Sequence, residues 1–246
     1  MQAKVFVARA AGAIGSRLWR GVLPHVEASG RRLIAPDLIG MGDSDKIPAG
    51  AEPDRYRFAS HARYLDAFID EVVGTEPLTL VLHDWGGALG FDWAYRHQQR
   101  VRAIAYMETF VAPVTLEDLP EGFHPTLKAV RSSAGEALVL DENMFIEKML
   151  PGVTQRTLSA DEMAEYRRPF PEAGDDRWPT LQWPREQRRC QSSLLTRSPG
   201  SRVGEGQKVP ASPGSTDFCR VGASYCRIGS RWKQKREIGI AGAVGG

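Results

Sequence analysis

Cysteine is scarce in this sequence, and long apolar runs are absent. The three cysteines among its 246 residues, Cys190, Cys219 and Cys226, have spacings that match no zinc pattern, and their odd number argues against a complete disulfide framework. No run approaches the roughly 20 apolar residues of a membrane span, and Lys4 and Arg9 interrupt the start, where a signal peptide needs an apolar core. We therefore expect a cytoplasmic chain with reduced thiols and no membrane or targeting segment.

Histidine is also scarce, and none follows residue 124. The five histidines are His25, His61, His83, His97 and His124. Histidine is the side chain that most often serves as a general base. A reaction that needs a histidine base can therefore draw on these five alone.

The formal net charge of +2 conceals an uneven distribution. Residues 188–246 contain 11 Lys and Arg against 3 Asp and Glu, which leaves 21 basic and 27 acidic residues in 1–187. The basic residues of this tail are scattered among 10 Gly and 8 Ser and do not line one face of a helix. We therefore expect little fixed structure in the tail and no role in nucleic-acid binding.

Short apolar runs alternate with amphipathic segments over the first 110 residues. Residues 32–36, 78–83 and 101–107 have the length and composition of buried strands. Residues 59–73 carry apolar side chains at intervals of three and four, as an amphipathic helix does, and a second helix is expected at about 87–97. Strands joined by such helices pair in parallel through right-handed crossovers. The sequence therefore predicts a doubly wound, mostly parallel α/β sheet.

The pattern changes after residue 113. Helical pieces broken by prolines follow, among them residues 136–150, and Ser159 opens an N-cap signature that Glu162 completes. Such a segment, placed after the strands, suggests a helical cap over the site. We expect three parts: the N-terminal part of the sheet domain in residues 1–113, the cap in residues 114–187 and the tail in residues 188–246.

The most informative motif is His83-Asp84-Trp85-Gly86-Gly87, which closes the predicted strand 78–83. Two glycines between an apolar run and a helix fit a nucleophile elbow, with Asp84 at the position that serine more often holds. A carboxylate there can attack carbon, although it can instead cap the following helix. Trp85 can aim its indole N–H into an apolar cavity as a hydrogen-bond donor, or it can pack beneath the cap.

Glu108 ends the next predicted strand. Ligands of doubly wound sheets bind beyond the carboxyl ends of the strands, where Asp37, Asp84 and Glu108 are expected. Because neighbouring parallel strands bring Glu108 near Asp84, its carboxylate can orient and stabilise a histidine base. It can equally be an acidic residue with a structural partner at the end of a strand.

Further segments surround this motif in a fixed order. In the sheet domain they are residues 16–20, 32–46, 63–69, 83–86, 88–94 and 104–108, and in the cap they are residues 150–152, 166–170 and 179–186. Together they resemble the haloalkane dehalogenases of the α/β-hydrolase superfamily. The resemblance covers about residues 16–187, and it is specific because the segments are numerous and collinear.

The resemblance implies an α/β-hydrolase fold and the hydrolysis of carbon–halogen bonds in haloalkanes, with an alkyl ester on Asp84 as intermediate. It implies that Asp84 is the nucleophile, Trp85 a halide-binding donor and Glu108 the catalytic acid that supports the base. Phe170 and Leu119 would line the pocket. A haloalkane and water are the only reaction partners implied, no metal or organic cofactor is required, and we expect a monomer that does not bind membranes.

Two features of the family are missing from the sequence. The family takes its second halide donor, an Asn or Trp, from a loop that aligns with Ala10-Ala11-Gly12-Ala13, which has no side-chain donor. Its base histidine lies near the C-terminus, where this sequence has none. The five histidines lie in segments in which the family does not have its base, so we expect none of the five to serve as the base. Without that base we expect an ester hydrolysis that fails or is very slow. Because the resemblance ends at about Gln187 and the family's first strands are missing ahead of Ser16, we also expect an incomplete sheet.

Three other interpretations remain open. The motif at residues 83–87 also resembles the epoxide hydrolases, which polarise the epoxide oxygen with cap tyrosines, and Tyr166 is the only tyrosine of the predicted cap. Alternatively, the chain is an inactive remnant. The rise in Arg, Ser and Gly after residue 187 is what a shifted reading frame produces, which supports the hypothesis of a frameshifted or truncated gene.

Overall fold

The structure is a computed structural model of the chain. It describes residues 4–10, 15–28, 30–109, 115–195 and 239–241, with side chains for residues 15–28, 30–109 and 115–186. Most of the expected tail, and residues 11–13 of the loop that lacks a halide donor, therefore lie outside the described residues.

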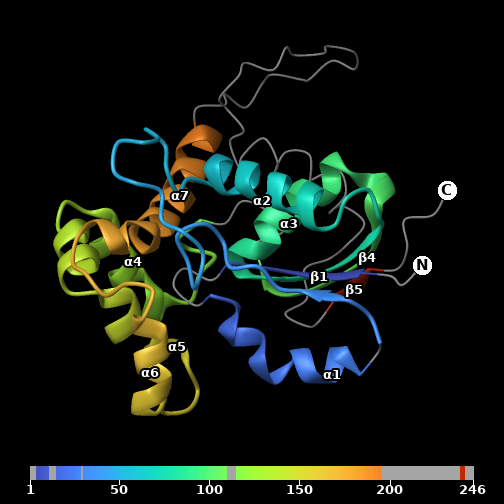
Figure 1. The fold of residues 1–246 in the computed structure, drawn as a ribbon. Coiled ribbons are helices and arrows are strands. Elements are labelled where there is room, and N and C mark those ends of the chain that lie inside the picture. The colour runs from blue at the N-terminus through green and yellow to red at the C-terminus, as the bar shows by residue number, and fades with distance from the viewer. Residues whose placement is uncertain (1–3, 11–14, 29, 110–114, 196–238, 242–246) are drawn as a thin grey trace.

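Strands and helices alternate along the described chain (Figure 1). The strands are β1 (Lys4–Ala10), β2 (Leu33–Ile34), β3 (Leu78–His83), β4 (Val101–Thr109) and β5 (Gly239–Ala241). The α-helices are α1 (Leu23–Glu27), α2 (Phe58–Val72), α3 (Asp84–Arg96), α4 (His124–Arg131), α5 (Leu150–Val153), α6 (Ala160–Arg167) and α7 (Trp178–Leu195). Short 3-10 or π turns are η1 (Ser16–Gly21), η2 (Gln98–Arg100), η3 (Glu121–Phe123), η4 (Ala137–Asp141), η5 (Phe145–Met149) and η6 (Asp175–Arg177). None of the described helices is long and apolar enough to cross a membrane.

The sheet has the order β2-β1-β3-β4-β5. β1 pairs in parallel with β2 and β3, β3 pairs in parallel with β4, and β5 runs antiparallel to β4. This order confirms the predicted mostly parallel α/β sheet, which in the described residues is small and open, as expected of an incomplete sheet. β1 is not among the predicted strands, although its run Val5-Phe6-Val7 is rich in residues that favour strands.

Helices lie on both faces of the sheet, with α2 and α3 on one face and α1 on the other (Figure 1). In β3, the buried residues Leu78, Leu80 and Leu82 alternate with half-buried ones, because successive side chains of a strand point to opposite faces. The leucines join the main hydrophobic core, whereas Val81 packs in a second cluster around Trp19 of η1. The sheet thus separates two cores, and the larger one continues into the cap.

The helices and turns from η3 to α7 fall within residues 115–195, and we call this segment the cap. That it covers the site stays a prediction. α7 packs against α4, and its residues Leu181 and Trp183 lie in the main core. The boundary expected at residue 187 falls inside α7, which continues to Leu195. The helix expected over residues 136–150 is divided into η4 and η5, between which Asn143 has a left-handed φ of 51°.

Candidate functional site

The backbone turns sharply where β3 passes into α3. Asp84, the first helical residue, has a φ of 49°, in the left-handed region that non-glycine residues rarely adopt. Thr109 at the end of β4 holds the turn, because it forms an isolated parallel bridge with Asp84 and its hydroxyl donates a 2.6 Å hydrogen bond to the Asp84 carbonyl oxygen. The structure therefore has the strand-to-helix elbow that the sequence predicts.

Two glycines of α3 allow the helix to approach the sheet closely. A Cβ atom at Gly87 would lie 1.5 Å from Thr109 Oγ1, and one at Gly90 would lie 2.3 Å from Leu82 Cδ2. Real Cβ atoms do not come so close to other heavy atoms. Glycine at these positions is therefore a packing requirement of the elbow.

Glu108 lies beside this elbow. In the pairing of β3 with β4, Met107 lies opposite His83 and Thr109 bridges to Asp84, so Glu108 falls between the two paired positions. Its φ is 43°, and its side chain is exposed. The two carboxylate-bearing residues thus reach the same edge of the sheet, as predicted, and the role of Glu108 as catalytic acid stays a prediction.

Trp85 follows Asp84 on the buried side of α3. Its side chain is 6% exposed and stacks on Trp183 of α7, with ring centroids 4.9 Å apart and planes 30° apart. Trp183 in turn stacks on the imidazole of His61 in α2, at 4.3 Å and 15°. His61 and Trp183 are not among the predicted site residues, because they come from distant parts of the sequence and no local pattern links them to Trp85.

Phe170, a predicted lining residue, follows α6 in the sequence. Its side chain is fully buried and lies in the main core. The Lys46 ammonium is 4.3 Å from its ring centroid and donates hydrogen bonds to the carbonyl oxygens of Pro169 (2.7 Å) and Asp176 (2.6 Å). Burial lowers the pKa of Lys46 to about 8, although Asp176 and Asp175 oppose that shift. Lys46 therefore fastens the Phe170 segment of the cap to the sheet domain.

Leu119, the other predicted lining residue, is half-buried in the loop before η3. Its carbonyl oxygen lies 2.9 Å from Nε2 of His124, which begins α4. Pocket lining by Leu119 and Phe170 stays a prediction.

The other histidines have different surroundings. His25 is exposed on α1. The ring of His97 stacks on Trp93, and its Nδ1 lies 2.9 Å from the carbonyl oxygen of Trp93. The ring of His83 contacts the indole of Trp19 in η1 edge to face. His61 is fully buried, and burial lowers its pKa to about 3. That none of the five serves as the base stays a prediction.

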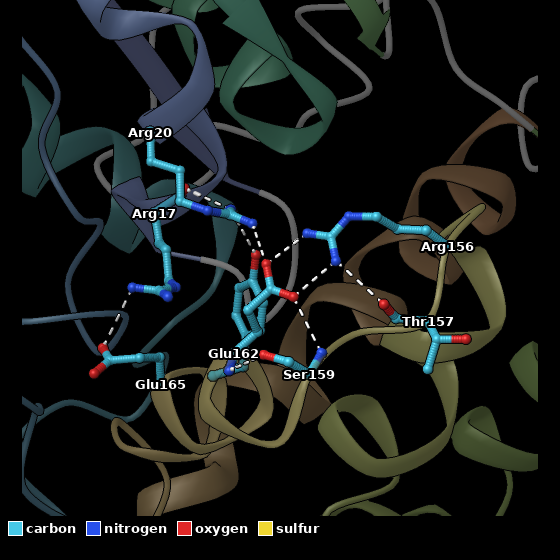
Figure 2. A network of polar contacts seen from close by, with 8 residues as sticks. Arg17, Arg20, Arg156, Thr157, Ser159, Glu162 and Glu165 are labelled. Carbon is cyan, nitrogen blue, oxygen red and sulfur yellow. Dashed lines mark hydrogen bonds and ion pairs between the residues drawn. The ribbon is translucent and has the colours of Figure 1, made fainter.

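A charged network joins η1 of the sheet domain to α6 of the cap (Figure 2). Glu162 accepts hydrogen bonds from Arg20 (2.8 Å) and from Arg156 (2.7 Å). Glu162 also accepts from the Ser159 backbone N–H, while the Ser159 hydroxyl accepts from the Glu162 N–H, so the predicted N-cap signature is a complete capping box. One carboxylate thus both caps α6 and links it to the sheet domain.

Three cross-links make up what we call the core–cap seam: Arg17 with Glu165, Arg20 with Glu162, and Asp43 with Arg168. These ion pairs border a hollow of about 360 Å³ whose lining contains both polar and apolar groups. The hollow is lined by residues of η1, the loop after β2 and α6, and the predicted catalytic and lining residues are not part of it.

Asp37, at the carboxyl end of β2, has a structural role. Its carboxylate accepts hydrogen bonds from the backbone N–H groups of Ser16 and Asp43, and its carbonyl oxygen accepts from the Ser44 hydroxyl at 2.6 Å. Asp37 therefore holds two loops together below the seam. Within the described residues, no group of three or more His, Cys, Asp or Glu side chains is placed to hold a metal ion.

Known sequences identify the family. The model of the α/β hydrolase fold matches residues 10–197. A haloalkane dehalogenase of Sphingobium indicum is 45% identical over 241 residues, which take in 93% of this chain and 78% of that protein. One from Mycolicibacterium smegmatis is 53% identical over 171 residues, covering 70% of this chain and 54% of that protein. A match to 93% of the chain reaches past residue 187 wherever it begins, so the similarity extends beyond the segments that carry the sequence resemblance.

Solved structures agree with this assignment. The crystal structure of an ancestral haloalkane dehalogenase has a TM-score of 0.73 and 35% sequence identity, covering 92% of this chain and 69% of that one. The similarity to that fold and the sharp turn at Asp84 of this chain both agree with the family that the sequence matches indicate. The chain belongs to the α/β hydrolase fold family and, within it, to the haloalkane dehalogenases.

Proposed function

We propose that this chain attacks haloalkanes with the carboxylate of Asp84. One carboxylate oxygen forms a bond to the carbon that carries the halogen, the carbon–halogen bond breaks, and the halide leaves with the electron pair. The observation that carries this proposal is the left-handed φ of 49° at Asp84, because strained backbone at a strand-to-helix turn presents a nucleophile at the edge of the sheet. The names of the two bacterial relatives support a halogenated substrate.

Trp85 has the proposed role of stabilising the departing halide. Negative charge develops on the halogen as the bond breaks, and an indole N–H in a dry cavity stabilises that charge in the transition state. The burial of Trp85 at 6% exposure supports this role. In the same proposal Phe170 and Leu119 surround the alkyl chain.

Hydrolysis of the ester is the step that we propose to be slow. Water must be deprotonated as it attacks the ester carbonyl, and Glu108 would support a base in that step. Because the sequence has no histidine after residue 124, where the family has its base, we expect the ester on Asp84 to accumulate. The lack of a side-chain donor at Ala10-Ala11-Gly12-Ala13 should instead slow the formation of the ester. A haloalkane and water are the reaction partners, and we propose a monomer acting in the cytoplasm.

The test is to incubate the protein with 1-bromobutane and to record its intact mass. We expect a mass increase of one butyl group, and peptide mapping should place it on Asp84. Asp84→Asn is the matched control, because asparagine also tolerates the left-handed conformation but is a poor nucleophile. If the wild-type chain gains no mass, or if Asp84→Asn gains as much, the proposal is wrong.

An epoxide hydrolase activity is less well supported. Tyr166, the tyrosine that would polarise an epoxide oxygen, is 5% exposed, and its hydroxyl accepts a 3.3 Å hydrogen bond from Arg20 Nη1 in the contact between sheet domain and cap. The relatives named above are haloalkane dehalogenases. Incubation with 1,2-epoxybutane should therefore give neither a diol nor an adduct under conditions in which 1-bromobutane alkylates Asp84.

A further inference from the structure

A row of aromatic rings begins at Tyr56, just before α2, passes through α7 and ends at Trp85 in the elbow. Its members are Tyr56, His61, Trp183 and Trp85, with exposures of 0%, 0%, 1% and 6%. The ring centroids of Tyr56 and His61 are 6.2 Å apart, and the rings from His61 onward stack face to face. The row therefore connects helix α2, helix α7 and the residue next to the proposed nucleophile.

Tyr56 fixes the far end of this row. Its hydroxyl accepts a 2.5 Å hydrogen bond from the Ile47 N–H and donates to the Ile47 carbonyl oxygen at 3.2 Å. A Cβ atom at Gly40 would lie 2.4 Å from its ring, so the loop after β2 packs directly against it. The row thus starts from a ring that has little freedom to move.

His61 is an unexpected residue at the centre of such a row. Neither of its ring nitrogens has a hydrogen-bond partner among the described residues. A buried polar group without a partner destabilises a fold by about 1–3 kcal/mol, so an apolar side chain would give a more stable core. What imidazole offers here is a flat five-membered ring, thin enough to stack on Trp183 beside Tyr56.

We propose that His61 is a positioning residue that fixes the plane of the Trp85 indole through Trp183. The indole N–H lies in the plane of its ring, so the tilt of Trp85 decides where the hydrogen bond to a halide points. A stack at 4.9 Å and 30° restricts that tilt, and the stack of His61 on Trp183, at 4.3 Å and 15°, restricts Trp183 in turn. This inference rests on the proposed function, because it assigns the orientation of its halide donor.

The test compares His61→Leu with wild type and with His61→Phe. We expect His61→Leu to lower the rate of Asp84 alkylation at saturating 1-bromobutane by about tenfold, because small errors in the placement of reacting groups have large effects on rate. The 1-bromobutane concentration that gives half of the maximal rate should change little. His61→Phe keeps a flat ring and should recover part of the rate.

A spectroscopic measurement reports the stack itself. The near-ultraviolet circular dichroism of two stacked indoles depends on their mutual angle, and Trp183→Phe identifies the band that belongs to this pair. We expect His61→Leu to weaken that band. The matched control is Ile69→Ala, which removes another buried side chain of α2 outside the row and should leave both the band and the alkylation rate close to wild type.

The outcomes separate the two proposals. If wild type forms no adduct, the proposed function is wrong, and the dichroism band alone then decides the positioning of Trp85. An unchanged band in His61→Leu overturns the inference, as does a loss in Ile69→Ala equal to that in His61→Leu at the same melting temperature. A full alkylation rate in His61→Leu also overturns it.

Discussion

The elbow and the core–cap seam hold their residues in place by different means. At the elbow, a strained backbone, two close-packed glycines and stacked aromatic rings fix Asp84 and Trp85. At the seam, ion pairs between half-exposed side chains join cap to sheet domain; Arg168 and Asp43, for example, are 52% and 73% exposed. Packing restricts geometry tightly and is insensitive to salt, whereas exposed ion pairs contribute about 0–1 kcal/mol each and are screened. The proposed attack by Asp84 therefore takes place at the elbow, where packing fixes the positions of the side chains.

The largest effect should come from crowding the elbow. Gly87→Ala places a Cβ atom against Thr109, and we expect it to lower the free energy of unfolding by about 3 kcal/mol. Chemical denaturation measures this change. Gly152→Ala is the control, because a Cβ atom there would meet nothing within 4 Å, and it should change stability little. In a Thr109→Ala background Gly87→Ala should cost less; an equal cost would contradict the assigned clash.

The backbone strain at Asp84 should have a smaller effect. Asp84→Gly and Asp84→Ala both remove the carboxylate, but only glycine adopts a φ of 49° without strain. We expect the glycine variant to be more stable than the alanine variant by about 1 kcal/mol. Thermal unfolding of the two variants side by side gives the difference, and an alanine variant as stable as the glycine variant would show that the turn is unstrained.

Lys46 tests the contact between cap and sheet domain by pH. Burial lowers its pKa from 10.5 to about 8 in the folded state, so between these values the unfolded chain binds more protons and stability rises with pH. We expect a rise below about 1 kcal/mol, since water screens this partly exposed amine. Denaturation between pH 8 and 10.5 should show this contribution in wild type and not in Lys46→Met; equal slopes would contradict it.

The smallest effect should be at Glu162. Hydrogen bonds from Arg156 and then from the Ser159 N–H lower its pKa, so its stabilising contribution is present above the ordinary pKa of a glutamate and is lost as pH falls below it. Glu162→Gln removes the charge but can keep the capping box. We expect faster amide hydrogen exchange in α6 at low salt and no change in α3.

Salt provides the control for this prediction. Raising the salt concentration to about 1 M shortens the screening length to about 3 Å, so wild type should approach the α6 exchange rates of Glu162→Gln. The variant itself should respond little. A response of α3 equal to that of α6 would remove the distinction between elbow and seam.

Local signals in the sequence predict much of the fold. The strand at residues 78–83 has the predicted bounds, and the signature at Ser159 and Glu162 is a capping box. Both depend on residues close together in the chain, where periodicity and capping chemistry act directly. The elbow at Asp84 belongs to the same class, because its strand, its glycines and its helix are contiguous.

Long-range features could not be predicted in this way. The left-handed φ of Asp84 depends on a bridge to Thr109 on another strand, and the stack on Trp85 depends on Trp183 of the cap. No local pattern encodes such pairs. Asn143, which interrupts the helix expected over residues 136–150, offered a weak signal, since asparagine tolerates left-handed backbone better than most residues.

The hydrogen bond from Thr109 to Asp84 also has a consequence for the order of folding. It closes a loop of 25 residues, whereas the contact of Arg20 with Glu162 spans 142. Short loops close with a smaller loss of chain entropy, and domains begin to fold from the N-terminus during synthesis. We expect β3, α3 and β4 to assemble while the cap is still being translated, so the left-handed turn at Asp84 is set in place before the cap partners of the seam, Glu162, Glu165 and Arg168, exist.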